Sequence, residues 1–303
     1  MDVLFSIIED ITEMKTRQVS HRDSIGRRQR FQRMPVGKKL IHSARDDEIL
    51  RWLYRYRYLR ASHLQQILKP KSPKRFVERL GDLYHETGFL NRPNFGAVQF
   101  DARCTSLLYE ISESGIRYID ALGTLPHRAV TISRRAPRGY SHQYLHSMMI
   151  IETLLSIELE TILHMDQRFV PVDEILARAP AKTQNAKNPL SVPVTLQPSA
   201  QYPFIRARQE TFIIPDGLYG IEYLIDGKKR YRFWALECER TNPFSRTNTK
   251  AASQNLKRAA YDALLSSNRY KEHWNIPNLK LNLVSAKAFQ KTNPFQKDKS
   301  GTM

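Results

Sequence analysis

Three carboxylates in the second half of the chain have the spacing of a metal site. Asp216 lies in an apolar run at residues 212–221, and Glu237 and Glu239 lie in a second apolar run at residues 230–240. The side chains of a β-strand alternate between two faces, so Glu237 and Glu239 leave the same face. Carboxylates that lie close together repel each other, and a hard cation with oxygen ligands relieves this repulsion. The pattern predicts that Asp216, Glu237 and Glu239 bind Mg²⁺ or Mn²⁺.

Such a metal site predicts cleavage of phosphodiester bonds. The reaction needs charge neutralised on the phosphate, an activated water and a stabilised leaving oxygen, and a bound divalent metal can supply all three. We predict Asp216 and Glu237 as metal ligands and Glu239 as a third ligand or a general base. A helix is expected after these runs, at residues 248–266. Four side chains on one stripe of this helix are grouped with the site: Lys250, Gln254, Lys257 and Tyr261.

Regular elements are expected on both sides of the three acids. Asp226-Gly227-Lys228 separates the two apolar runs, and Asp-Gly supplies the positive-φ residues of a tight turn, so the runs predict a β-hairpin. A long apolar helix is expected at residues 141–164, a strand at residues 169–173 and an alternating strand at residues 279–284. Residues 178–203 show weak periodicity and predict a surface loop or a partly disordered segment.

These motifs resemble known nucleases and relaxases. Pro215-Asp216 followed by Glu237-x-Glu239 resembles the core of PD-(D/E)xK nucleases, with Glu239 in the position of the usual lysine. The runs IIPDGLY and FWALECERTNP, with a later Lys and Tyr, resemble the replication-relaxation family and the MobC-type relaxases of mobilisable plasmids. The resemblance covers residues 45–285. It implies an N-terminal winged helix joined to a nuclease-like domain, and it places a histidine, here His146, at the head of the first helix of that domain.

The acid at position 239 leaves two outcomes open. Lys257 or Lys250 could take the role of the usual lysine, and the site would then cut DNA. A site with three acids and no lysine could also bind metal without cutting.

The first half of the chain predicts a DNA-reading module. Helices are expected from residue 44, at residues 60–68 and at residues 72–85, and wing strands at residues 89–93 and 106–111. Ser72-Pro73 starts the third helix in the favoured order of N-cap and proline. Three helices followed by a hairpin are typical of a winged helix-turn-helix, whose third helix enters the major groove.

The third helix of this module carries most of the expected DNA contacts. Its apolar positions, with Val77 among them, are expected to face inward, while Arg79 and Asp82 point outward. Arginine can bind guanine through two hydrogen bonds, so Arg75 and Arg79 are predicted to read bases, and the nearby lysines to contact phosphates. The alternative for Arg79 is an ion pair with Glu78 or Asp82. The predicted DNA-binding residues are Lys71, Lys74, Arg75, Arg79 and, in the first wing strand, Arg92.

The composition favours a polyanionic partner. The 303 residues include 48 Lys and Arg against 30 Asp and Glu, which gives a formal net charge of +18 and a pI near 9.9. Residues 15–103 hold 21 Lys and Arg against 8 Asp and Glu, so the excess overlaps the predicted DNA-reading module. A charge of this size and distribution favours nucleic acid as the partner.

Several other classes of protein are excluded by what the sequence lacks. The two cysteines, Cys104 and Cys238, allow neither a disulfide framework nor a cysteine-rich zinc site. The chain has no GxxxxGK[ST] loop for ATP and no run of about eighteen apolar residues that could span a membrane. Its first residues lack the basic start of a secretory signal. The expected location is the cytoplasm, in association with nucleoid or plasmid DNA.

The sequence predicts an α+β or α/β protein with two domains. Residues 1–43 are expected to form an amphipathic helix and a basic arm, residues 44–123 the winged helix-turn-helix, and residues 124–140 a linker. By the resemblance, residues 141–286 form a three-layer α/β domain of the restriction-endonuclease, PD-(D/E)xK type. Residues 287–303 are expected to be a basic, frayed tail.

The predicted function is sequence-directed DNA binding with metal-dependent nicking, of relaxase or endonuclease type, in the processing of plasmid or mobile-element DNA. The alternative is a non-catalytic winged-helix regulator or relaxosome accessory protein with a degenerate nuclease domain. A third hypothesis is a protein-interaction adaptor. Expected partners are double-stranded DNA, a second copy of the chain and other DNA-processing proteins, with no role for a membrane.

Overall fold

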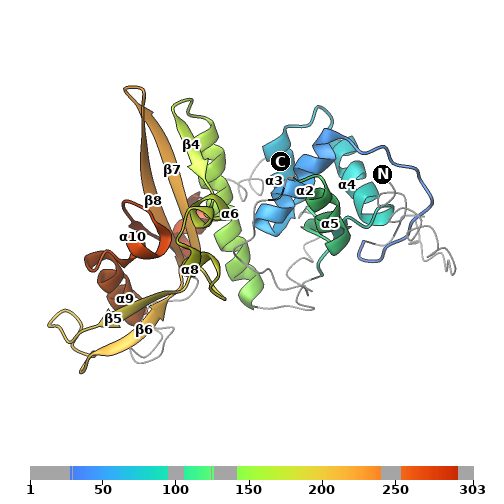
Figure 1. The fold of residues 1–303 in the computed structure, drawn as a ribbon. Helices are drawn as coiled ribbons and strands as arrows, with labels where there is room; N and C mark the ends of the chain where they lie inside the picture. Colours follow the sequence, from blue (N-terminus) through green and yellow to red (C-terminus); the bar gives the residue numbers. More distant parts are fainter. Residues whose placement is uncertain are drawn as a thin grey trace.

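The computed structural model describes residues 28, 30–94, 106–123, 125, 142–239 and 254–292. Within these ranges the chain is a mixed α+β protein with three separate sheets (Figure 1). The expected class is therefore confirmed at the level of α+β. The amphipathic helix expected at the start of the chain, and the expected linker except residue 125, lie outside the described residues.

The N-terminal part of the described chain combines four helices with a small sheet. Its elements are α2 (Ala44–Tyr56), β1 (Tyr58–Arg60), α3 (Ala61–Leu68), α4 (Pro73–His85), β2 (Leu90–Asn91), β3 (Leu108–Ile111) and α5 (Glu113–Ala121). The strands pair antiparallel in the order β1-β3-β2. The three helices and two strands expected before residue 112 are present, whereas β1 was not expected.

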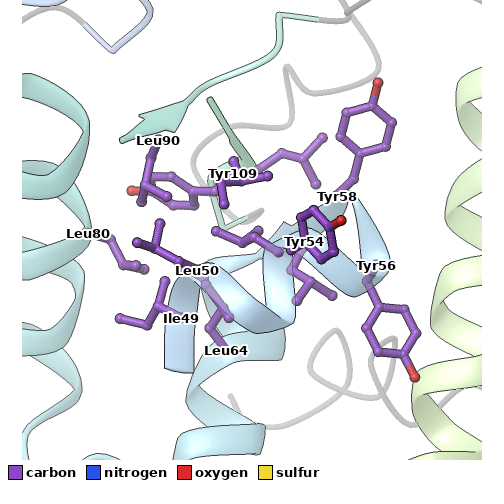
Figure 2. Close-up of a cluster of buried hydrophobic side chains, with 14 of the residues drawn as sticks. Ile49, Leu50, Tyr54, Tyr56, Tyr58, Leu64, Leu80, Leu90 and Tyr109 are labelled. Carbon is purple, nitrogen blue, oxygen red and sulfur yellow. The ribbon is translucent and has the colours of Figure 1, made fainter. Parts of the chain in front are cut away.

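Local sequence explains where α4 begins. The Ser72 hydroxyl accepts a hydrogen bond from the backbone N–H of Arg75 at 3.4 Å, and Pro73 occupies the first turn. The apolar side of α4 then joins a core built from all the elements of this unit (Figure 2). Its members include Ile49, Leu50, Tyr54, Leu64, Leu80, Leu90 and Tyr109.

For two side chains of α4, the orientation predicted from the sequence was wrong. Val77 is 39% exposed, because Phe76 and Leu80 already fill the inward ridge of the helix. Asp82 is buried, because residues preceding α2 lie across this part of α4 and bring Arg28 and Lys38 to its carboxylate. The described end of the basic arm is therefore packed on α4.

The C-terminal part contains a four-stranded sheet and a separate two-stranded sheet. Its elements are α6 (His142–Ile162), β4 (Gln167–Val170), α7 (Val172–Ala177), α8 (Ala181–Gln184), β5 (Val192–Leu196), β6 (Gln209–Ile213), β7 (Gly217–Ile225), β8 (Lys228–Glu239), α9 (Gln254–Ser266), α10 (Arg269–Trp274), β9 (Lys280–Ser285) and α11 (Ala286–Thr292). The larger sheet has the order β4-β7-β8-β9, with β8 and β9 parallel. Strands β5 and β6 form the smaller sheet.

The β7–β8 hairpin confirms the prediction from Asp226-Gly227. These two residues have φ values of 50° and 70°, so both adopt the left-handed conformation that a tight hairpin turn requires. The pairing of Gly217 with Leu236 sets the register at the other end of the hairpin. Continued by one residue, this register brings Asp216 opposite Glu237.

Helix α6 belongs to both parts of the molecule. Tyr144, Met148 and Leu155 are buried in the core of the N-terminal part, while Met149 packs with Phe169 and other residues of the larger sheet. Figure 1 shows α6 between the α2–α5 unit and the strands β4, β7 and β8. The helix thus links the expected DNA-reading module to the sheet that carries the three acids.

Two expectations for irregular segments were wrong. Residues 178–203 contain α8 and β5, and the alternating Val192, Val194 and Leu196 of β5 are buried in the core. Residues 287–292, expected to be frayed, continue α11. No helix in the described ranges is long and apolar enough to span a membrane.

Candidate functional site

Asp216 lies in the short connection between β6 and β7 and is held by two other elements. Its Oδ1 accepts a hydrogen bond from Nε2 of His146 on α6 at 3.1 Å. Its Oδ2 accepts one from the backbone N–H of Cys238 on β8 at 2.9 Å. The carboxylate is therefore fixed between the head of α6 and the end of β8.

Glu237 lies beside Asp216 and is buried, with only 1% of its surface exposed. Its Oε2 accepts a hydrogen bond from Nζ of Lys257 at 2.6 Å, and its Oε1 accepts one from the hydroxyl of Tyr261 at 2.7 Å. Lys257 and Tyr261 are one helical turn apart on α9, so both reach the same strand residue. Two members of the stripe expected on this helix, Lys257 and Tyr261, therefore face Glu237.

The two carboxylates influence each other's protonation. Burial and the charge of Asp216 raise the pKa of Glu237, and the opposing effects of Lys257 and Tyr261 are smaller. Burial alone would raise the pKa of Asp216, but the hydrogen bonds from His146 and the Cys238 N–H hold this pKa below its usual value. Asp216, which is partly buried, is thus the more acidic member of a pair of neighbouring carboxylates.

Lys257 supplies the positive charge closest to this pair. Burial would lower the pKa of its ammonium, yet the attraction of Glu237, with smaller contributions from Asp216 and Glu239, raises the pKa above the usual value. Its Nζ also lies 3.9 Å from Oε1 of Glu239. Lys257 therefore bridges Glu237 and Glu239, and the structure brings together all four residues predicted for catalysis.

Mg²⁺ or Mn²⁺ would fit the chemistry of Asp216 and Glu237. The pKa of Glu237 is raised partly by the charge of Asp216, so a cation between the two would be favoured. Mg²⁺ is commonly bound through one or two carboxylates and the phosphates of its substrate. Within the described ranges, no three His, Cys, Asp or Glu side chains are arranged to hold a metal ion. The participation of Glu239 as a third ligand stays a prediction.

Comparisons of the chain with models of protein families, with curated proteins and with solved structures find no match.

The predicted DNA-binding residues divide into two groups. Lys71, Lys74 and Arg75 are exposed at the start of α4, with side chains open to solvent. Arg79 instead binds Asp46 on α2 through two hydrogen bonds, from its Nε at 2.9 Å and from its NH2 at 2.6 Å. The expectation of an outward-facing Arg79 was wrong, because Asp46 is buried at the start of α2 and attracts the guanidinium.

Arg92 also has partners inside the protein. Its guanidinium carbon lies 4.3 Å from the centre of the Tyr84 ring and 5.2 Å from that of Tyr109. One of its nitrogens donates to the Tyr109 hydroxyl at 3.2 Å. Arg92 therefore fastens β2 to α4 and β3, rather than reaching outward from a wing strand.

Some site residues fall outside what the structure or the sequence pattern covers. Lys250 lies outside the described residues, and Gln254 is described only as the first residue of α9. The sequence did not predict that the backbone N–H of Cys238 binds Asp216 or that the carboxylate of Asp46 binds Arg79. A backbone donor leaves no trace in side-chain patterns, and an acid such as Asp46 in the first turn of a helix is common there without any distant partner.

Proposed function

We propose that the chain binds DNA through its N-terminal module and uses the site at Asp216 and Glu237 to nick one DNA strand with a divalent metal. The observation that carries this proposal is the meeting of the buried Glu237 carboxylate with the partly buried Asp216 carboxylate and with Lys257, from three different segments. Catalytic sites favour such groups, whose pKa values are shifted in opposite directions: burial and the charge of Asp216 raise that of Glu237, and hydrogen bonds lower that of Asp216. The net charge of +18 favours a nucleic-acid substrate.

Each residue of the site has a distinct role in this proposal. Bound Mg²⁺ or Mn²⁺ would be held by Asp216 and Glu237, and it would neutralise charge on the phosphate and activate a water. His146 positions the Asp216 carboxylate, and Tyr261 positions that of Glu237. Lys257 offers its ammonium to the reacting phosphate, in the role that the usual lysine has in the PD-(D/E)xK pattern.

The arrangement of elements supports the fold proposed for each part. In the N-terminal part, α2, β1, α3 and α4 are followed by the β2–β3 pair, which is the order of a winged helix-turn-helix with α4 as the reading helix. In the C-terminal part, α6 and α9 pack on the sheet that carries Asp216 and Glu237, as in a PD-(D/E)xK core. The same features support the proposed relation to the replication-relaxation family and the MobC-type relaxases.

The test is Mg²⁺- or Mn²⁺-dependent nicking of a supercoiled plasmid by the full chain and by a Glu237→Ala variant. We expect the variant to lose nicking by at least about a hundredfold, the size of effect that single electrostatic groups have in active sites. Its affinity for DNA should stay close to that of the wild type. The matched control is Glu222→Ala, which removes another buried carboxylate from the same sheet. Nicking by the Glu237→Ala variant at the wild-type rate would refute the proposal.

A second candidate is a non-catalytic DNA-binding protein with a degenerate nuclease site, acting as a regulator or relaxosome accessory. The observation that favours it is the 2.6 Å contact of Lys257 with Glu237, since an internal ammonium already balances the buried carboxylate without a metal. This candidate predicts tight, salt-sensitive DNA binding and no nicking with any divalent metal by the wild-type chain.

A further inference from the structure

An exposed aromatic side chain lies close to Asp216 along the chain. Phe212, near the end of β6, is 67% exposed, and Ile214, in the connection that follows, is 49% exposed. A fully extended chain spans about 3.3–3.6 Å per residue, so the Cα atoms of Phe212 and Asp216 are at most about 14 Å apart. The backbone of the apolar pair Phe212 and Ile214 therefore lies within about 14 Å of the Cα atom of Asp216.

The register of the β5–β6 hairpin determines the direction of Phe212. Val192 pairs with Ile213, and both are buried in the core that includes α9. Pro193 pairs with Phe212, and both are exposed. Because neighbouring residues of a strand face opposite sides, the Phe212 ring is turned away from α9. Figure 1 shows this hairpin extending beyond α9 at the edge of the molecule.

The charge around Phe212 suits a polyanion. Arg206 and Arg208 precede β6, and both are exposed. The nearest acid along the strand, Glu210, is compensated by hydrogen bonds from Thr195 at 2.9 Å and from Arg208 at 3.3 Å. An apolar pair preceded along the chain by two exposed arginines fits a nucleic-acid strand better than a protein helix.

We propose that Phe212, with Ile214 beside it, forms a stacking platform for an unpaired base of a single DNA strand whose phosphate lies at the Asp216–Glu237 site. This inference rests on the proposed function and names the form of DNA that the site takes. A base inside a duplex is stacked on both faces by its neighbours, whereas an unpaired base can place one face on an aromatic ring. The duplex is bound by α4, and the strand that reaches Phe212 is locally unpaired.

The test measures binding of a short fluorescein-labelled oligothymidylate to the full chain in EDTA, by fluorescence anisotropy. Stacking of a base on an aromatic side chain contributes enough that its removal weakens binding by about 5- to 100-fold. We expect that loss for Phe212→Ala and near wild-type binding for Phe212→Tyr, which keeps the ring. Binding of a blunt duplex should be unchanged by both substitutions. The matched control is Leu224→Ala, which removes a similarly exposed apolar side chain from the far end of β7.

The inference is overturned if Phe212→Ala binds the oligothymidylate as the wild type does, or if it weakens single strand and duplex equally. An equal loss with Leu224→Ala would overturn it as well. Because the measurement needs no cleavage, it separates the two proposals. Normal stacking in a chain that never nicks would refute only the proposed activity, and Glu237-dependent nicking without an effect of Phe212→Ala would refute only the platform.

Discussion

The hydroxyl of Tyr261 completes the hydrogen bonding of the buried Glu237 carboxylate. A Tyr261→Phe variant leaves one oxygen of a buried, charged group without this donor, which costs about 1–3 kcal/mol of the free energy of unfolding. Urea denaturation monitored by circular dichroism measures this loss. The control is Tyr270→Phe, which removes a hydroxyl that donates to the neutral Asn268, with an expected cost of about 0.5–1.5 kcal/mol. A smaller loss for Tyr261→Phe than for Tyr270→Phe would contradict the role given to Glu237.

Arg79 and Lys74 are five residues apart on α4, yet their substitutions should differ in kind. Arg79→Ala removes the partner of the buried Asp46, and we expect it to lower the free energy of unfolding by about 1–3 kcal/mol. Lys74→Ala should leave stability unchanged and weaken DNA binding uniformly across sequences. Thermal melting and DNA titration of both variants check this contrast. A fully stable Arg79→Ala variant with relaxed sequence preference would restore base reading to Arg79.

At the scale of residues, the sequence predicted the grouping of the candidate site better than the surroundings of Arg79 and Arg92. Asp216, Glu237 and Lys257 were found because alternation along β8 and the helical period of α9 fix which side chains share a face. The partner of Arg79 was not found, because it depends on how α2 packs against α4. Such ion pairs join residues far apart in the sequence, and the local periodicity of a helix or strand cannot predict them.

Among the elements, α6 gives the clearest test of how the two parts are held together. Glu158 on α6 is buried and accepts hydrogen bonds from Arg55, at 2.6 Å, and from the hydroxyl of Tyr56. A Glu158→Gln variant keeps an acceptor oxygen for only one of these two donors, turns an amide NH₂ toward the other, and removes the charge that pairs with Arg55. We expect a loss of about 1–3 kcal/mol in the free energy of unfolding.

The control for Glu158 lies on the same helix. Glu160→Gln changes an exposed residue, so its free energy of unfolding should stay within about 0.5 kcal/mol of the wild type. Hydrogen exchange measured by mass spectrometry should show faster exchange in both α2 and α6 of the Glu158→Gln variant alone. Equal stability of the two variants would mean that the ion pair at Glu158 does not hold α6 to α2.

The elements that the sequence predicted are those with a strong local signal. Asp226-Gly227 predicts a tight turn, and the apolar segment of α6 is long enough to predict a helix rather than a strand. Strand β1 has three residues and α8 has four, too few for a period to emerge. In β5, Val192, Val194 and Leu196 alternate with Pro193 and Thr195, but a proline argues against a strand, and packing against α9 is what buries this segment. Short elements of this kind form because tertiary contacts bury them. The periodicity of the sequence cannot predict those contacts.

For the whole molecule, the net charge overstates the number of Lys and Arg side chains that are available to contact DNA. Several arginines of the N-terminal part have hydrogen-bond or ion-pair partners within the protein: Arg28, Arg33, Arg55, Arg79 and Arg92. The exposed Lys71, Lys74 and Arg75 at the start of α4 point to solvent instead. A helix N-terminus with three nearby cations is a favourable place for phosphate.

The salt dependence of duplex binding counts the cations that replace counterions on DNA. Each phosphate contact contributes about −0.9 to the slope of log K against log salt concentration for duplex DNA. A triple variant, Lys71→Ala, Lys74→Ala and Arg75→Ala, should therefore make the slope less steep by about 2–3. The matched control replaces Lys182 and Lys187, which are exposed near α8 in the C-terminal part, and should leave the slope unchanged. If the control flattens the slope as much as the triple variant does, duplex DNA lies on the C-terminal part, and α4 is not the reading helix.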